Sequence, residues 1–186
     1  MKHFNGKAAG ALIFVGAVQF ILSMLIAECL YPNYSVSSNY ISDLGKLDAA
    51  SAPVFNTSVF VLGFTVVIGT YFLRRTIRGK VFLGFLVLCG IGAMGVGIFP
   101  EDFGILHTIV SLIAFLFGAL SAIASHGYQK PPLSYFAVVL GLTSLAALVM
   151  FATNIYLGLG KGGMERMIAY PVLLWAIAFG GHLMKE

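Results

Sequence analysis

Long apolar runs dominate the chain, and short polar segments separate them. A helix needs roughly 20 apolar residues to cross the hydrocarbon of a bilayer. Six runs meet that need, near residues 8–30, 53–73, 81–99, 105–125, 133–157 and 164–184. None of them alternates with the period of two that barrel strands show. The pattern therefore predicts an all-α membrane protein, a bundle of six transmembrane helices in which residues 1–186 form one polytopic domain.

Turn-forming residues mark the ends of these runs. Pro32-Asn33 follows the first run, Pro53 opens the second, Pro100 ends the third, and a glycine-rich stretch precedes the sixth. The connection between the first two runs, residues 31–52, is long, and long loops are often functional. Its residues 37–45 predict a short helix with serine at its start and Gly45 at its end. We expect this helix to lie at the membrane interface or on the end of the bundle.

The composition supports a lipid environment. The chain is 59% hydrophobic and only 10% charged, whereas a soluble domain is about 45–50% apolar and about 25% charged. No basic patch interleaved with aromatic residues predicts nucleic-acid binding. Cys29 and Cys89 have neither metal-type spacing nor a disulfide framework. We therefore expect no cofactor and no metal, with membrane lipids as the partners and a homo-oligomer left open.

The positions of Lys and Arg predict the orientation, because cytoplasmic loops carry an excess of both. With the N-terminus inside, eight basic residues lie on the cytoplasmic side, namely Lys2, Lys7, Arg74, Arg75, Arg78, Lys80, Lys130 and Lys185. Three lie outside, namely Lys46, Lys161 and Arg166. Both termini are therefore predicted to be cytoplasmic in a multi-pass protein of the cell membrane.

Small residues predict how the helices pack. Helices in lipid associate through close backbone approach. Cys89, Ala93 and Gly97 fall four residues apart in the third run, with further glycines beside them. We expect this third helix to be central in the bundle.

Polar chemistry gathers at the outer ends of the predicted helices. No carboxylate or lysine lies at mid-depth, which argues against a pump or ion-coupled transporter. Three hypotheses fit the outer cluster. In the first, Arg166 pairs with Asp43, Glu101 or Asp102 and ties the outer loops together. In the second, the cluster binds a lipid head or a small polar ligand. In the third, a carboxylate and His107 act as an acid–base pair. The candidate binding residues are Ser42, Asp43, Glu101, His107, Glu165 and Arg166, and the catalytic candidates are His107, Asp43, Glu101 and Asp102.

Several short motifs resemble a known family. They are Ile-Ser-Asp-Leu-Gly at residues 41–45, Phe-Pro-Glu-Asp at 99–102 followed by His107, and Gly-Met-Glu-Arg at 163–166. Their order resembles the archaeal and bacterial membrane family of domain of unknown function 998, and it is remotely similar to the six-span Frag/DRAM/Sfk family. The first family has no established activity. The second is associated with autophagy, lipid-anchor remodelling and membrane lipid organisation, so this resemblance implies lipid rather than solute.

These observations favour a non-enzymatic membrane protein that binds or organises lipid through the outer polar cluster. The alternative is an interfacial lipid hydrolase or transferase that uses an Asp/Glu–His pair. A small-molecule transporter is third, since it requires a water-filled path at mid-depth.

Overall fold

Six long helices make up most of the structure. The computed structural model describes the backbone of residues 2–185 and the side chains of residues 4–185. The helices are α1 (Lys2–Leu30), α2 (Ala52–Leu73), α3 (Lys80–Ile98), α4 (Ile105–Ala124), α5 (Leu133–Ala152) and α6 (Gly160–Lys185). All six are long and apolar enough to cross a membrane. Residues 2–185 hold no strand, so the prediction of six membrane-spanning helices is confirmed at the level of length and composition.

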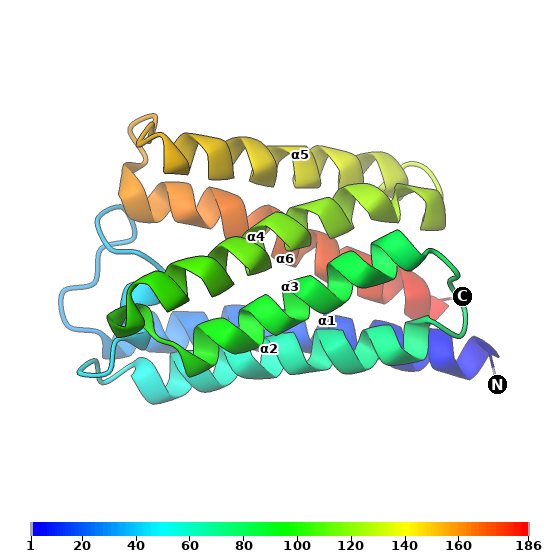
Figure 1. Ribbon diagram of the computed structural model, residues 1–186, viewed down its shortest axis with the longest axis horizontal. Helices are drawn as coiled ribbons and strands as arrows, with labels where there is room; N and C mark the ends of the chain where they lie inside the picture. Colours follow the sequence, from blue (N-terminus) through cyan, green and yellow to red (C-terminus); the bar gives the residue numbers. More distant parts are fainter. Residues whose placement is uncertain (1, 186) are drawn as a thin grey trace.

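Three short 3-10 helices lie in the connections: η1 (Ser42–Gly45), η2 (Glu101–Phe103) and η3 (Ser125–Tyr128). The two termini lie at one end of the bundle (Figure 1). The opposite end, called the loop end here, consists of residues 31–51, 99–104 and 153–159. Residues 31–51 are called the first loop.

Two predicted boundaries were wrong. Helix α5 ends at Ala152 rather than at residue 157, and Asn154 and Leu157 beyond it have positive φ angles of 57° and 48°. Helix α6 begins at Gly160 rather than at residue 164. Its glycines had been interpreted as helix breakers, but a Cβ at Gly162 would lie 2.5 Å from the carbonyl oxygen of Val36. These glycines let the first loop approach the start of α6 closely.

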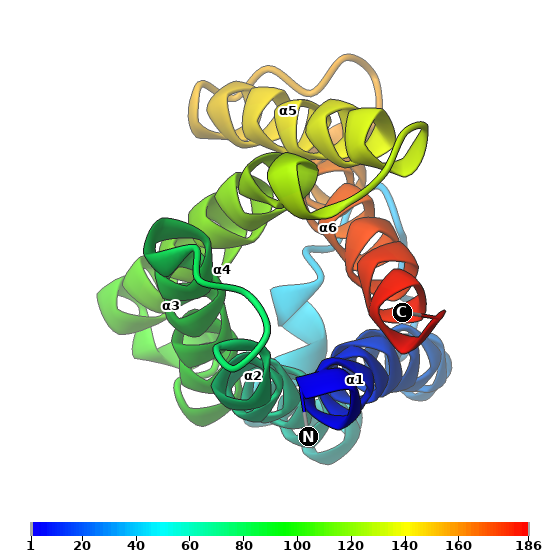
Figure 2. The same ribbon diagram turned by 90° about the vertical axis from the view of Figure 1, so that its right-hand side faces the viewer.

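The helices form a ring. Each packs on its neighbour in sequence, and α1 packs on α6 to close the circle, while α4 also contacts α6 so that α5 lies on the outside (Figure 2). Helix α3 is one member of this ring, between α2 and α4, so the expectation of a central third helix was wrong. Its small residues face two neighbours instead. Gly90 lies against Gly63 of α2, and Gly92 lies against Ala114 of α4.

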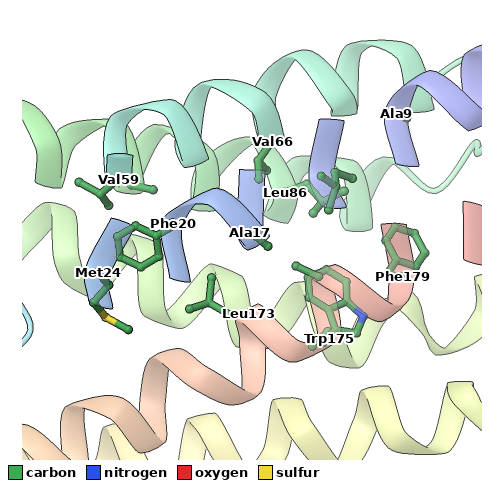
Figure 3. Packing of buried hydrophobic residues seen from close by; sticks show 14 of the residues in the cluster. Ala9, Ala17, Phe20, Met24, Val59, Val66, Leu86, Leu173, Trp175 and Phe179 are labelled. Carbon is green, nitrogen blue, oxygen red and sulfur yellow. The ribbon is translucent and has the colours of Figure 1, made fainter. Parts of the chain in front are cut away.

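The interior of the ring is densely packed toward the termini. Buried side chains of α1, α2, α3 and α6 meet along the interior, and those of Trp175 and Phe179 lie toward the termini (Figure 3). The rings of Trp175 and Phe179 stack with centroids 5.5 Å apart, and Phe82 packs edge-on against Phe179. The Trp175 Nε1–H donates to Ser125 Oγ over 2.9 Å, so the indole has a polar partner inside the bundle. We call Phe82, Tyr128, Trp175 and Phe179 the aromatic plug.

The first loop folds into the loop end of the ring. The helix predicted over residues 37–45 is shorter, a single 3-10 turn at Ser42–Gly45. Leu44 is fully buried and Ile41 is nearly so. Ser51 Oγ donates to the Leu44 carbonyl, and Asn56 Nδ2 of α2 donates to the Gly45 carbonyl. The loop is thus an ordered part of the bundle.

The close contact of α2 and α3 can be tested at Gly63. A Cβ there would meet the Gly90 carbonyl and lie 2.6 Å from Met94 N. Overpacking of this kind costs about 1–3 kcal/mol. Gly63→Val should therefore lower the thermal unfolding midpoint of the detergent-purified protein. Gly84→Ala is the control, because nothing lies within 4 Å of its Cβ. Equal midpoints for the two variants would contradict the close contact.

Candidate functional site

A buried arginine joins three parts of the loop end. Arg166 is 4% exposed. Its Nη2 donates to Glu28 Oε1 of α1 and to the Tyr34 hydroxyl of the first loop, both over 2.6 Å. Its Nη1 donates to the carbonyls of Val36 and Gly162, both over 3.1 Å. The expected pairing of Arg166 with Asp43, Glu101 or Asp102 was wrong. Glu28 is its partner because α1 and α6 are neighbours in the ring.

Tyr34 extends this network. Burial raises the pKa of Tyr34 to about 12, although the Arg166 contact lowers it. The phenol is therefore protonated at neutral pH, and it donates to the Tyr40 carbonyl over 3.0 Å. Tyr34 thus accepts from Arg166 and donates to the first loop at once.

Glu165 precedes Arg166 in the chain but has a different environment. Successive residues of an α-helix point about 100° apart, and Glu165 faces the first loop and the interior of the ring. Its Oε2 accepts the backbone N–H of Ile41 over 2.5 Å. The residue is 6% exposed. Among residues 4–185, no ion pair involves Glu165.

The other carboxylates organise the loops. Asp43 accepts from Asn39 Nδ2 and from Tyr40 N, and it pairs with Lys46. Burial opposes the charge of Asp43, but these hydrogen bonds outweigh burial and hold its pKa below the ordinary value. Burial, followed by the negative charge of Asp43, raises the pKa of Glu101.

Glu101 and Asp102 link η2 to the first loop. Glu101 accepts from Ser42 Oγ over 3.3 Å and lies 3.7 Å from Lys46 Nζ. Asp102 accepts the Leu47 N–H over 3.0 Å. These contacts hold the two loops together across the end of the ring.

His107 is the third residue of α4 and is buried. Its Nδ1 lies 2.8 Å from the Phe99 carbonyl oxygen. A carbonyl only accepts, so Nδ1 carries a proton and donates. In the neutral ring, Nε2 then accepts from Ser111 Oγ over 3.2 Å. Within residues 4–185, no hydrogen bond joins His107 to a carboxylate.

Two adjoining cavities meet at these residues. One is an interior cavity of about 100 Å³, lined mainly by apolar side chains of α1, α2, α3, α4 and α6. The other is a pocket of about 420 Å³ between α4 and α5 at the loop end, called the side pocket here. Both are lined by Ser42, His107, Ser111, Phe115 and Glu165. The polar groups therefore stand where an apolar space meets a more polar one.

The structure brings part of the predicted site together. Four of the six predicted binding residues line the side pocket, namely Ser42, Glu101, His107 and Glu165. Asp43 and Asp102 bind the loops, and Arg166 faces α1. No three metal-binding side chains of the described residues cluster.

Sequence reasoning missed Ser111, which is not among the predicted site residues. Its signal was its spacing, because residues four apart on a helix share a face, and Ser111 follows His107 by four.

The Arg166–Glu28 pair should be essential for stability. Removing one partner of a buried ion pair costs about 3–5 kcal/mol, because a charge remains buried without compensation. Glu28→Gln should therefore lower the thermal unfolding midpoint sharply. The double variant Glu28→Gln/Arg166→Gln removes the stranded charge as well, and it should recover part of the loss. A double variant less stable than Glu28→Gln would contradict this account.

Comparison with known proteins places the chain in a family. No curated protein and no solved structure matches it. One family model matches residues 14–182, which include all six helices in whole or in large part, and its description is "Protein of unknown function (DUF998)". The chain therefore belongs to the DUF998 family of proteins of unknown function.

Proposed function

We propose that this protein binds membrane lipid at its loop end, in the extracytoplasmic leaflet of the cell membrane. The observation that carries the proposal is the junction of the interior cavity with the side pocket at Ser42, His107, Ser111, Phe115 and Glu165. The excess of Lys and Arg on the termini side supports an outward-facing loop end.

The junction suits a molecule with one apolar and one polar part. Phe20, Val59 and Leu173 are among the apolar side chains that line the interior cavity. Glu101, His107 and Glu165 line the side pocket. Part of a lipid chain in the first space and its head in the second would satisfy both surfaces, because apolar surface favours burial against apolar surface and buried polar groups need partners.

The depth of the polar groups fits a lipid head. At about 1.5 Å of rise per residue, His107 lies roughly 3 Å and Ser111 roughly 9 Å from the first residue of α4. Lipid heads occupy the interfacial region just outside the hydrocarbon. The polar side chains thus lie at the depth where a head joins its chains.

The aromatic plug favours a binding site over a transport path. Phe82 and Phe179 are almost fully buried, and Trp175 stacks on Phe179. These rings fill the interior on the termini side. The remote resemblance of the loop motifs to the Frag/DRAM/Sfk family also supports lipid rather than solute as the ligand.

Filling the interior cavity should abolish lipid retention. Ala114 lines that cavity, and Ala114→Phe places a ring in it. Native mass spectrometry of the wild-type protein in mild detergent should show a bound lipid that the variant lacks. Ala146→Phe is the matched control, because Ala146 is exposed on α5 and lines neither cavity. Equal lipid occupancy in wild type and Ala114→Phe would refute the proposed site.

A lipid hydrolase is a second candidate, and the Ser111–His107 hydrogen bond favours it. Ser111 Oγ would attack the carbonyl carbon of a lipid ester while His107 Nε2 takes its proton. His107 would return that proton to the leaving alcohol, and water would then release the acyl group from Ser111. The Phe99 carbonyl would hold the imidazole in the required tautomer.

Labelling with a fluorophosphonate probe tests this candidate. An activated serine should react at Ser111, and His107→Ala should reduce the labelling rate by about 10²-fold or more, as expected for loss of a general base. Ser144→Ala is the control, because Ser144 is a buried serine that donates to the Ile168 carbonyl. Absence of labelling at Ser111 would contradict this candidate and would mean that the Ser111–His107 hydrogen bond is structural.

A further inference from the structure

We propose that the ligand head carries a positive charge, an ammonium group, and that Glu165 binds it. This inference rests on the proposed function, since it assigns the head group of the amphiphile in the same pocket. Glu165 lines both the interior cavity and the side pocket.

The first argument is the missing cation. A buried carboxylate is costly unless it is paired and hydrogen-bonded, and ionisable groups within membrane helices usually mark function. Glu165 is 6% exposed, and its only hydrogen bond among residues 4–185 is from the Ile41 N–H to Oε2. The neighbouring guanidinium of Arg166 is engaged by Glu28. Oε1 of Glu165 is thus available for a ligand.

The second argument is the charge of the side pocket. Two carboxylates, Glu101 and Glu165, line it together with His107, and neither Lys nor Arg does. Lys46 stands near Glu101, and Lys161 lies against Tyr40 of the pocket wall, so Glu165 is the carboxylate of this pocket that has no ion pair among residues 4–185. The pocket therefore attracts a cationic head and repels an anionic one.

The third argument is the presence of aromatic rings in the wall of the side pocket. Tyr40 and Phe151 line the side pocket, and their ring centroids lie 5.8 Å apart. Lys161 Nζ already lies 4.2 Å from the Tyr40 centroid, so this ring binds an ammonium group of the protein itself, and Phe151 supplies the other part of the aromatic wall. Aromatic faces attract alkylammonium groups. An ammonium head could therefore contact a carboxylate and an aromatic wall together, with part of its chain in the interior cavity.

The test compares three amphiphiles with one chain and different heads: dodecylamine, dodecanol and dodecanoate. Each is titrated against the detergent-purified protein at pH 7, and binding is read by native mass spectrometry. A hydrogen bond between charged groups exceeds a neutral one, so the amine should bind the wild type at least about tenfold more tightly than the alcohol.

Glu165→Gln should remove most of that preference. The amide oxygen can still accept the Ile41 N–H, so the fold has no reason to change. Amine affinity should fall about tenfold, while dodecanol affinity stays constant and reports an intact pocket. Asp48→Asn is the matched control, because it removes an exposed loop-end carboxylate outside the pocket. If Glu165→Gln proves unstable, Glu101→Gln should weaken amine binding in the same direction.

Each outcome has a distinct meaning. Equal binding of amine and alcohol to the wild type, tightest binding of dodecanoate, or an unchanged preference in Glu165→Gln would overturn the cationic head. The lipid site would survive those results if Ala114→Phe still blocked dodecanol. Failure of all three amphiphiles to bind the wild type would overturn both proposals.

Discussion

The structure of the loop end depends on the hydrogen bonds and the ion pair that the buried guanidinium of Arg166 makes. It joins α1 through Glu28, the first loop through Tyr34 and Val36, and its own helix through Gly162. Charge-assisted hydrogen bonds of this kind are about twice as strong as neutral ones. They act where the last helix meets the first, which is also where the ring closes. With this contact in place, the first loop has one position over the cavity.

Glu165 and Arg166 show how adjacent charges can take separate roles. The cation is compensated within the protein, because Glu28 faces it across the α1–α6 contact. Within the described side chains, the carboxylate has a single hydrogen-bond donor, the Ile41 N–H, and it faces the cavities. One charge therefore stabilises the fold, and the other is the one that we propose binds a ligand. The same contrast separates the two halves of the bundle, since aromatic rings fill the termini half whereas cavities occupy the loop half.

Sequence periodicity and turn residues were sufficient for the six helices, because a span must be apolar throughout its length. They were insufficient for the start of α6, where glycine permits close approach to Ser37 and Asn39 rather than ending the helix. The partner of Arg166 was missed because it depends on which helices are neighbours, and an apolar pattern alone does not specify the order of helices in a ring. The prediction that α3 is central, which was based on its small residues, failed for a related reason. They occur at most of the helix contacts, so their presence marks contact rather than centrality.

The closure of the ring by α1 and α6 has a consequence for biosynthesis. Helices α2 to α5 can each pack on the preceding helix as they leave the ribosome, but the contact of α1 with α6 must wait for α6. Val36, Ser37 and Asn39 of the first loop also lack part of their contacts until then, because they lie against Gly160, Gly162 and Arg166. Glu28 has no cation partner until then. A nascent chain thus carries an unfinished site through almost all of its translation, and the pocket comes into being only when the final helix is inserted.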